Sequence, residues 1–188
     1  MPGLVFKTIH ELALEQHGML TTDQAEELGV TRDRLSKMVQ TGDLIRVARG
    51  LYRDTAAPET RLTPYMAAAL WPLTTVGLLS HQTVLGLLDI SDVVPGQIHI
   101  TVPRGFRKRA SRPLPGVMLH QADVPENERT AIEGVPATSV ARAIRDCAMD
   151  NIGPALLRQA MKDARANGWL TDVEATRLAE DLAADGKL

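Results

Sequence analysis

Two short stretches with the spacing of amphipathic helices, separated by a glycine, constrain the fold of this 188-residue chain more than any other feature. Apolar side chains recur at i, i+3 and i+4 spacing in residues 24–28 and again in residues 31–40, which gives each stretch one apolar face. Thr21 and Thr31 stand where helix N-caps are expected, and Gly29 permits a sharp turn between the helices. The pattern predicts a helix-turn-helix.

A hairpin is predicted directly after the second helix. Residues 44–47 and 51–53 are the expected strands, and Arg49 and Gly50 form the tip between them. A helix-turn-helix with such a hairpin is a winged helix, and we assign it to residues 1–55.

The charge of this region differs from that of the rest of the chain. Residues 29–53 contain six basic and two acidic side chains, a net charge of +4, whereas the whole chain carries −2. A local basic patch on an acidic protein is typical of a surface that binds DNA. The alternative is a small helical domain with solvated charges that makes protein contacts only.

If the region binds DNA, the second helix reads base edges in the major groove, while the wing contacts the backbone or the minor groove. The side chains that we expect to contact DNA are Thr31, Arg32, Arg34, Ser36, Lys37 and Gln40 of the helix and Arg46, Arg49 and Arg53 of the wing.

The organisation of the chain changes after Tyr52. Residues 56–61 are polar, contain a proline and are predicted to be a linker, so that residues 62–188 form a second domain. Helices are expected at 62–71 and 80–88, strands at 97–102, 117–121 and 128–132, and further helices at 139–149, 154–167 and 172–184. The predicted fold class is α+β, with an N-terminal winged helix-turn-helix and a second α+β domain that has a small antiparallel sheet and C-terminal helices.

Four motifs along the chain resemble the AbiEi-type antitoxins of type IV toxin–antitoxin systems. They are the wing sequence of residues 42–52, Ser80-His81 at the start of an apolar helix, residues 98–103, and residues 134–142 followed by Asp146. The resemblance implies an N-terminal winged helix, repression of the protein's own operon, and a second domain that contacts or counteracts a nucleotidyltransferase toxin.

A second basic cluster lies in a predicted loop between two strands. Residues 103–112 carry five positive charges and no acidic side chain: Arg104, Arg107, Lys108, Arg109 and Arg112. Such a loop can contact phosphate groups, dock an acidic protein partner, or remain solvated without a partner.

The sequence offers few candidates for catalysis or metal binding. Cys147 is the single cysteine and falls in an apolar helical pattern, which indicates a buried thiol and excludes an internal disulfide. His99 and His120 fall in successive strands and are expected to form a packing or hydrogen-bonding pair. Ser80 is expected to cap a helix, and adjacent helical residues diverge, so that we expect no bond to His81. We therefore expect neither an enzyme nor a metal or cofactor site.

No apolar run reaches the length of a membrane span, so a cytoplasmic protein without membrane contact is expected. The last helix, residues 172–184, is predicted to be amphipathic, with Val173, Leu178 and Leu182 among alanines, which suits packing on its own domain or on a second subunit in a homodimer. Three hypotheses follow: a regulator that binds its own double-stranded operator, an adaptor without DNA binding, and a nucleic-acid-processing enzyme.

Overall fold

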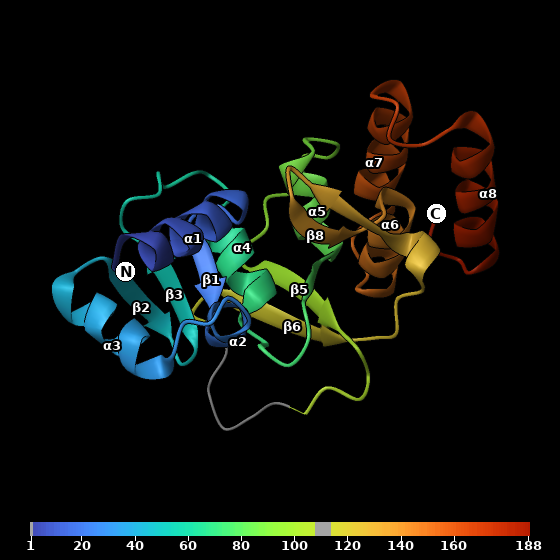
Figure 1. The fold of residues 1–188 in the computed structure, drawn as a ribbon. Helices are drawn as coiled ribbons and strands as arrows, with labels where there is room; N and C mark the ends of the chain where they lie inside the picture. Colours follow the sequence, from blue (N-terminus) through green and yellow to red (C-terminus); the bar gives the residue numbers. More distant parts are fainter. Residues whose placement is uncertain (1, 108–113) are drawn as a thin grey trace. The chain divides into compact units, whose positions relative to one another are not determined.

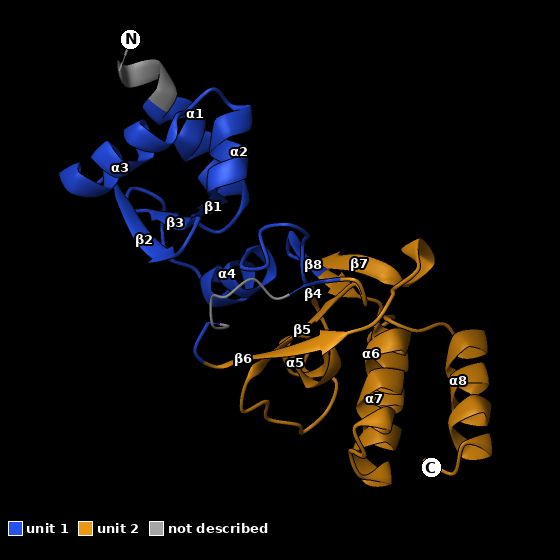
Figure 2. Cartoon of the chain, turned by 90° about the horizontal axis from the view of Figure 1, so that it is seen from below, with its two compact units in different colours: residues 1–77, 106–115, 132–136 blue, residues 78–105, 116–131, 137–188 orange. Residues whose placement is uncertain are grey.

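The computed structural model of the protein describes residues 2–107 and 114–188 (Figure 1). The described chain forms two compact units (Figure 2). The N-terminal unit takes in residues 2–77, 106–107, 114–115 and 132–136, and the C-terminal unit takes in residues 78–105, 116–131 and 137–188.

The N-terminal unit is a winged helix followed by one further helix. Its elements are α1 (Pro2–Glu15), β1 (Met19–Thr21), α2 (Thr22–Glu27), α3 (Arg32–Thr41), β2 (Leu44–Ala48), β3 (Leu51–Asp54) and α4 (Thr63–Leu70). The three strands form an antiparallel sheet in the order β1-β3-β2, with β2 at the edge. The predicted helix-turn-helix and wing are confirmed, and each element begins and ends within two residues of its predicted bounds.

Local capping explains why the two helices of the motif begin where they do. The Thr21 hydroxyl accepts a hydrogen bond from the backbone N–H of Gln24, whose side chain accepts one from the backbone of Thr21. Thr31 caps α3 by accepting from the backbone N–H of Arg34. The turn between the helices passes through Gly29 at φ +77°, a conformation that glycine adopts without steric cost.

An apolar core holds the winged helix of this unit together. Leu35 and Met38 project from α3 into it, and Leu20 and Tyr52 contribute from the sheet. The other buried members are Ile9, Ala13, Ala25, Val30 and Leu44. Because α3 uses these side chains for packing, its opposite side stays in contact with solvent.

The segment predicted as a linker, residues 56–61, is tied to the N-terminal unit. Ala57 is buried, and the hydroxyl of Thr60 lies 3.0 Å from Nδ1 of His17. Thr63 donates from its hydroxyl to the carbonyl of His17 at 2.9 Å, and α4 packs against β1. The compact units thus divide at residue 77. The predicted domains 1–55 and 62–188 differ from these units and stay a prediction.

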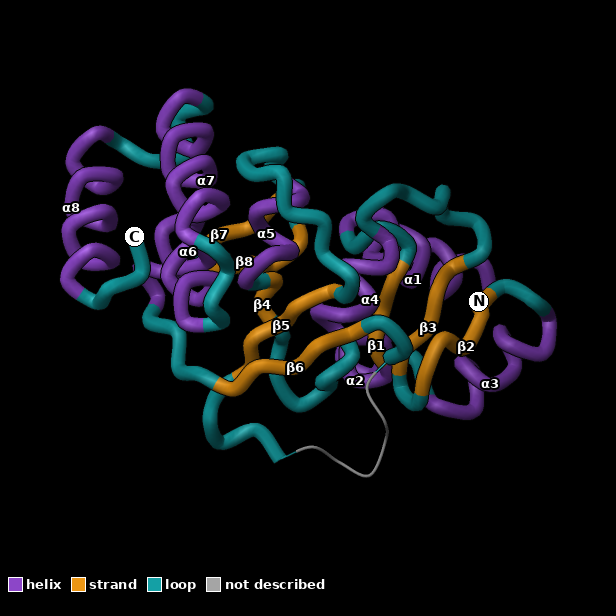
Figure 3. Tube along the Cα trace, turned by 180° about the vertical axis from the view of Figure 1, so that it is seen from behind, coloured by secondary structure: helices purple, strands orange, loops and turns teal. Residues whose placement is uncertain are grey.

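The C-terminal unit contains four α-helices and a sheet. Figure 3 distinguishes its helices from its strands by colour. Its elements are β4 (Leu78–Leu79), α5 (His81–Leu87), β5 (Ile98–Val102), β6 (Val117–Gln121), the 3-10 helix η1 (Glu126–Glu128), β7 (Arg129–Ile132), β8 (Val135–Thr138), α6 (Val140–Met149), α7 (Pro154–Ala166) and α8 (Asp172–Ala184). Ile132, Val135 and Pro136, at the turn from β7 to β8, group with the N-terminal unit. Helix α5 packs on β5 and α6, and α6 contacts α7 and α8.

The α+β class is confirmed, and the directions of the strands are more varied than the predicted antiparallel sheet. The strand order is β6-β5-β4-β8-β7; β4 pairs with β5 antiparallel, whereas β4 with β8 and β5 with β6 pair parallel. Residues 103–116 join β5 to β6, and a connection of that length can return the chain to run in the same direction. The two-residue hairpin of Glu133 and Gly134 has positive φ at both positions, as a type I′ turn requires.

Charged side chains link α6 to the segment before β7. Arg142 donates to Glu128 at 2.7 Å and to Asp146 at 2.8 Å, and Arg145 donates to Glu128 at 2.8 Å. Partial burial disfavours the charge of Glu128, but the hydrogen bonds and charges of the two arginines outweigh burial and hold its pKa below the usual value. The predicted i, i+4 ion pair of Arg142 with Asp146 is therefore present within a larger network.

Among the described residues, no helix has both the length and the apolar character needed to cross a lipid bilayer.

Cys147 lies in α6 with no exposed surface, and burial raises the pKa of its thiol far above the usual value. We expect the native protein to resist a thiol-specific reagent at pH 8 and to react fully only in denaturant. Ala183→Cys, at an exposed position of α8, is the positive control. Rapid labelling of native Cys147 would show that α6 is not packed as described.

Glu128→Gln should destabilise the protein at pH 7 by about 1–3 kcal/mol, because charge-assisted hydrogen bonds to two arginines are weakened. Since the folded-state pKa of Glu128 is depressed, its contribution is present above the ordinary glutamate pKa of about 4.3 and is lost as the pH falls through the folded-state value. Urea unfolding at pH 7 and at pH 3 measures the difference. An equal effect at both pH values, or an equal effect of Glu180→Gln in α8, would contradict this role.

Candidate nucleic-acid interface

The exposed side of α3 carries the polar residues that were predicted to contact DNA. Ser36, Lys37 and Gln40 are exposed, while Leu35 and Met38 on the other side are buried. Helical spacing places Ser36 and Gln40 one turn apart along the same face. The face is therefore free of core packing and presents hydroxyl, ammonium and amide groups.

Two predicted contacts at the start of α3 are already engaged within the protein. Thr31 is exposed, but its hydroxyl accepts the capping hydrogen bond from the backbone N–H of Arg34. Arg32 lies across from Glu26 of α2, with Nε 2.7 Å from one carboxylate oxygen and Nη2 3.4 Å from the other. The Glu26 carboxylate raises the pKa of this guanidinium and offsets its charge. Arg32 remains 73% exposed, so the pair lies at the surface.

The wing presents two of its three arginines to solvent. Arg46 is exposed on the edge strand β2, and Arg49 is exposed at the tip. Arg53 differs from the prediction, because its side chain is only 23% exposed and lies 3.9 Å from the carboxylate of Glu59. The strand register gives the reason. Arg46 pairs with Tyr52 and Arg53 with Ile45, so the two arginines project from opposite faces of the hairpin.

Two apolar residues of the wing are exposed, a feature that the sequence analysis did not single out. Ile45 and Val47 keep 46% and 40% of their surface in contact with solvent. Both lie on β2, whose register shifts between Arg46 and Ala48. Their exposure shows that the core does not cover this part of the edge strand.

The second basic cluster is described only in part. Arg104 and Arg107 are exposed, and the backbone N–H of Arg104 donates to Asp123 at 3.1 Å. Phe106 packs edge-on against Trp71, with ring centroids 6.4 Å apart. Lys108, Arg109 and Arg112 lie outside the described residues. The interaction of this loop with nucleic acid or protein stays a prediction.

The predicted pairing of His99 with His120 takes the form of a hydrogen-bond contact, and a third histidine joins it. Nδ1 of His99 lies 2.9 Å from Nε2 of His120, and the ring of His81 stacks on His120 with centroids 3.6 Å apart. Burial is the main cause that lowers the pKa of all three, that of His81 to about 3. These imidazoles are therefore neutral near pH 7.

One prediction about this cluster was wrong. Ser80 Oγ lies 2.8 Å from Nδ1 of His81, although adjacent residues in a helix diverge. Ser80 precedes α5 in an extended conformation, and His81 has φ +53°, so the helical angle between neighbours does not apply to them. Ser80 stands at the N-cap position but makes no side-chain capping bond.

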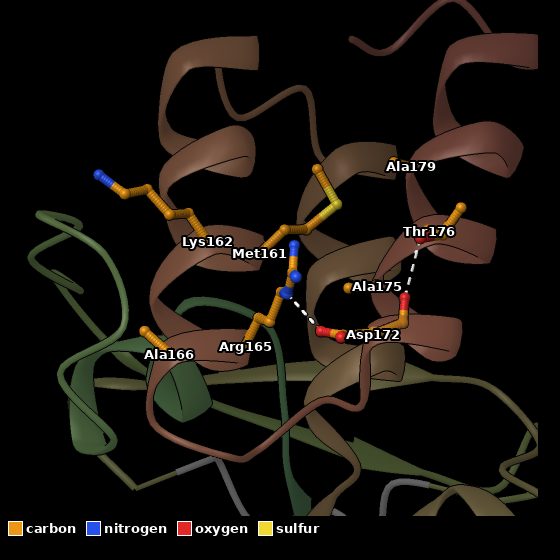
Figure 4. A pocket seen from close by; sticks show the side chains of 8 residues that line it. All are labelled: Met161, Lys162, Arg165, Ala166, Asp172, Ala175, Thr176 and Ala179. Carbon is orange, nitrogen blue, oxygen red and sulfur yellow. Dashed lines mark hydrogen bonds and ion pairs between the residues drawn. The ribbon is translucent and has the colours of Figure 1, made fainter.

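Helices α7 and α8 border a shallow groove, whose lining is drawn in Figure 4. An ion pair of Arg165 with Asp172 links the two helices, and Ala175 and Ala179 supply small side chains on the α8 side. Leu178 and Leu182 are buried, so the predicted amphipathic face of α8 packs within its own unit.

Comparison with known proteins gives three findings. A search of curated proteins returned no match. The crystal structure of the RV2827C protein from Mycobacterium tuberculosis resembles this fold with a TM-score of 0.53 at 16% identity, over 92% of this chain and 70% of that chain. Residues 7–53, which span the helix-turn-helix and the wing, match the family model described as transcriptional regulator, AbiEi antitoxin, and the predicted family resemblance is thereby confirmed for the N-terminal region.

Proposed function

We propose that this protein is a cytoplasmic, DNA-binding transcriptional regulator of antitoxin type that represses its own operon. The observation that supports the proposal most directly is the exposed polar face of α3 beside Arg46 and Arg49, all within the region that matches the regulator family. Lys37 and Gln40 suit base edges in the major groove, whereas the two wing arginines suit phosphates. The proposed activity is binding, without catalysis.

The partners follow from the same proposal. Double-stranded operator DNA is the first partner, and a nucleotidyltransferase toxin is the second, as the family resemblance implies. A homodimer would place two recognition helices on a two-fold operator and strengthen binding by linking two contacts. Co-purification of the protein with a nucleotidyltransferase encoded beside it would test the toxin partner.

Arg49→Ala tests the wing. The variant should bind operator and random DNA more weakly by a similar factor, because a phosphate contact carries no sequence information. The slope of log affinity against log salt should lose about one unit of magnitude. Fluorescence anisotropy across a series of salt concentrations measures both quantities.

The matched control for this experiment is Lys7→Ala, which removes one exposed positive charge from α1, an element not predicted to contact DNA. It should leave the salt slope unchanged. If Arg49→Ala and Lys7→Ala behave alike, the wing does not contact DNA. If the unaltered protein binds no DNA at any salt concentration, the adaptor hypothesis is favoured, with exposed Ile45 and Val47 as its apolar contact.

Glu26→Gln tests whether the ion pair of Glu26 with Arg32 limits the contact of Arg32 with DNA. Removing the carboxylate leaves the guanidinium free to contact DNA, so DNA affinity should rise and the salt slope should steepen by about one unit. A larger gain on operator than on random DNA would assign Arg32 to a base, and an equal gain would assign it to a phosphate.

Two controls separate this effect from a general change of charge. Glu27→Gln removes the same charge from the next position of α2 and should raise affinity less. Combining Glu26→Gln with Arg32→Ala should cancel the gain. A gain that persists in the double variant would show that Arg32 is not the group released.

A further inference from the structure

We propose that His81, His99 and His120 form a binding site for a divalent transition-metal ion of the zinc class. One ring nitrogen from each histidine lies within 4.8 Å of the other two. The site lies in the C-terminal unit and is separate from α3 and the wing. It goes beyond the proposed DNA-binding function, and it revises the expectation that His99 and His120 form a packing or hydrogen-bonding pair without a metal site.

The fold brings the three residues together from separate elements. His99 and His120 lie on the parallel strands β5 and β6, where His99 pairs with Met118 and Thr101 pairs with His120. Since alternate residues of a strand share a face, His99 and His120 occupy diagonal positions on the same side of the sheet. His81 begins α5, which packs on β5.

The backbone conformation of His81 sets the direction of its imidazole. Its φ of +53° lies in the left-handed region, which few residues other than glycine adopt, histidine more often than most. In that conformation the imidazole stacks on His120 and its Nδ1 reaches Ser80. Such backbone conformations gather at ligand sites, where the surrounding structure holds them.

Hydroxyl groups behind His81 can fix which nitrogen faces an ion. Ser80 Oγ lies 2.8 Å from Nδ1 of His81 and also 2.8 Å from the hydroxyl of Thr101. A serine oxygen has two acceptor positions, so it can accept from Thr101 and from an Nδ1–H of His81 together. That arrangement leaves Nε2 of His81 unprotonated. Metal-binding histidines are usually oriented in this way by a hydrogen bond from the other nitrogen.

The surrounding charges favour a cation. Asp150 has a carboxylate oxygen 3.8 Å from Nε2 of His81. Asp146 attracts His120, and its Oδ2 is buried without a hydrogen-bond partner. The charge of Arg142 also acts on His81, and Arg142 is paired with Glu128 and Asp146. Imidazole binds metal ions through an unprotonated ring nitrogen.

The distance between His99 and His120 fits a zinc-class ion after a small adjustment. Zinc–nitrogen bonds of about 2.0–2.1 Å at tetrahedral angles place two ligand nitrogens about 3.3 Å apart. Nδ1 of His99 and Nε2 of His120 are 2.9 Å apart, so they need to separate by only about 0.4 Å. The ring of His81 has to turn out of its parallel stack on His120 for its nitrogen to face the ion.

Three imidazole ligands leave a fourth position for Asp150 or a water molecule. Imidazole suits zinc and its neighbours, whereas magnesium and calcium prefer oxygen ligands. Because an ion that binds only the folded state stabilises it, loading should raise the unfolding temperature of the protein.

The test titrates metal-stripped full-length protein with Zn²⁺ by calorimetry and with Co²⁺ by visible absorption. We expect one ion per chain, a rise in unfolding temperature, and the visible bands of four-coordinate cobalt. Mg²⁺ should produce none of these changes. Absence of binding, or binding only at millimolar concentration, would overturn the proposal.

His120→Asn should abolish binding, since it removes one ligand from β6, a strand at the edge of the sheet. His17→Asn, in the N-terminal unit, is the matched control and should bind normally. Circular dichroism of the metal-free variants shows whether each has folded. Equal Zn²⁺ binding by His120→Asn and the unaltered protein would overturn the proposal, as would equal loss in His17→Asn.

Ser80→Ala keeps all three ligands and tests the positioning role of the hydroxyl. We expect Zn²⁺ affinity to fall about 10–100-fold while the stoichiometry stays at one ion per chain. Affinity within twofold of the unaltered protein would rule out this role of Ser80. DNA binding, measured separately, reports on the proposed regulatory function and does not depend on this result.

Discussion

The burial of Leu35 and Met38 in the N-terminal core decides which side of α3 faces solvent. A ten-residue helix has little stability alone, so packing of its apolar side fixes its orientation. The same packing leaves Ser36, Lys37 and Gln40 exposed as a group. The proposed DNA contacts of α3 therefore depend on the core behind the helix.

Ion pairs within the free protein then limit which exposed charges can contact DNA. A count of basic residues treats Arg32, Arg49 and Arg53 as equivalent, but they differ in the structure. Arg32 shares its charge with Glu26, and Arg53 is half-buried beside Glu59. A DNA phosphate would have to compete with these carboxylates for the two guanidinium groups, whereas Arg49 is exposed at the wing tip. The positive local charge thus predicts a surface that can bind DNA. The ion pairs within the protein determine which of its arginines can contact DNA.

The parts of the fold that the sequence predicted correctly are those set by neighbours in the chain. Periodicity and capping at Thr21 and Thr31 located the helix-turn-helix, because these interactions span only a few residues. The directions of the strands in the second sheet, and the opposite faces of Arg46 and Arg53, depend on pairing between distant segments and on register. Local patterns do not contain that information.

The histidine cluster likewise has one part that local sequence predicts and another part that depends on the folded structure. Strand alternation was sufficient to place His99 near His120, since both fall on strands of adjacent sequence order. The contribution of His81 depended on one backbone angle, a positive φ that the sequence alone does not predict even though histidine adopts it more often than most residues. Burying three imidazoles beside carboxylates has a cost in solvation free energy. Apolar side chains in the same positions would not have this cost. The coordination of a cation is one interaction that could offset this cost, and it would use the same neutral nitrogens that burial maintains.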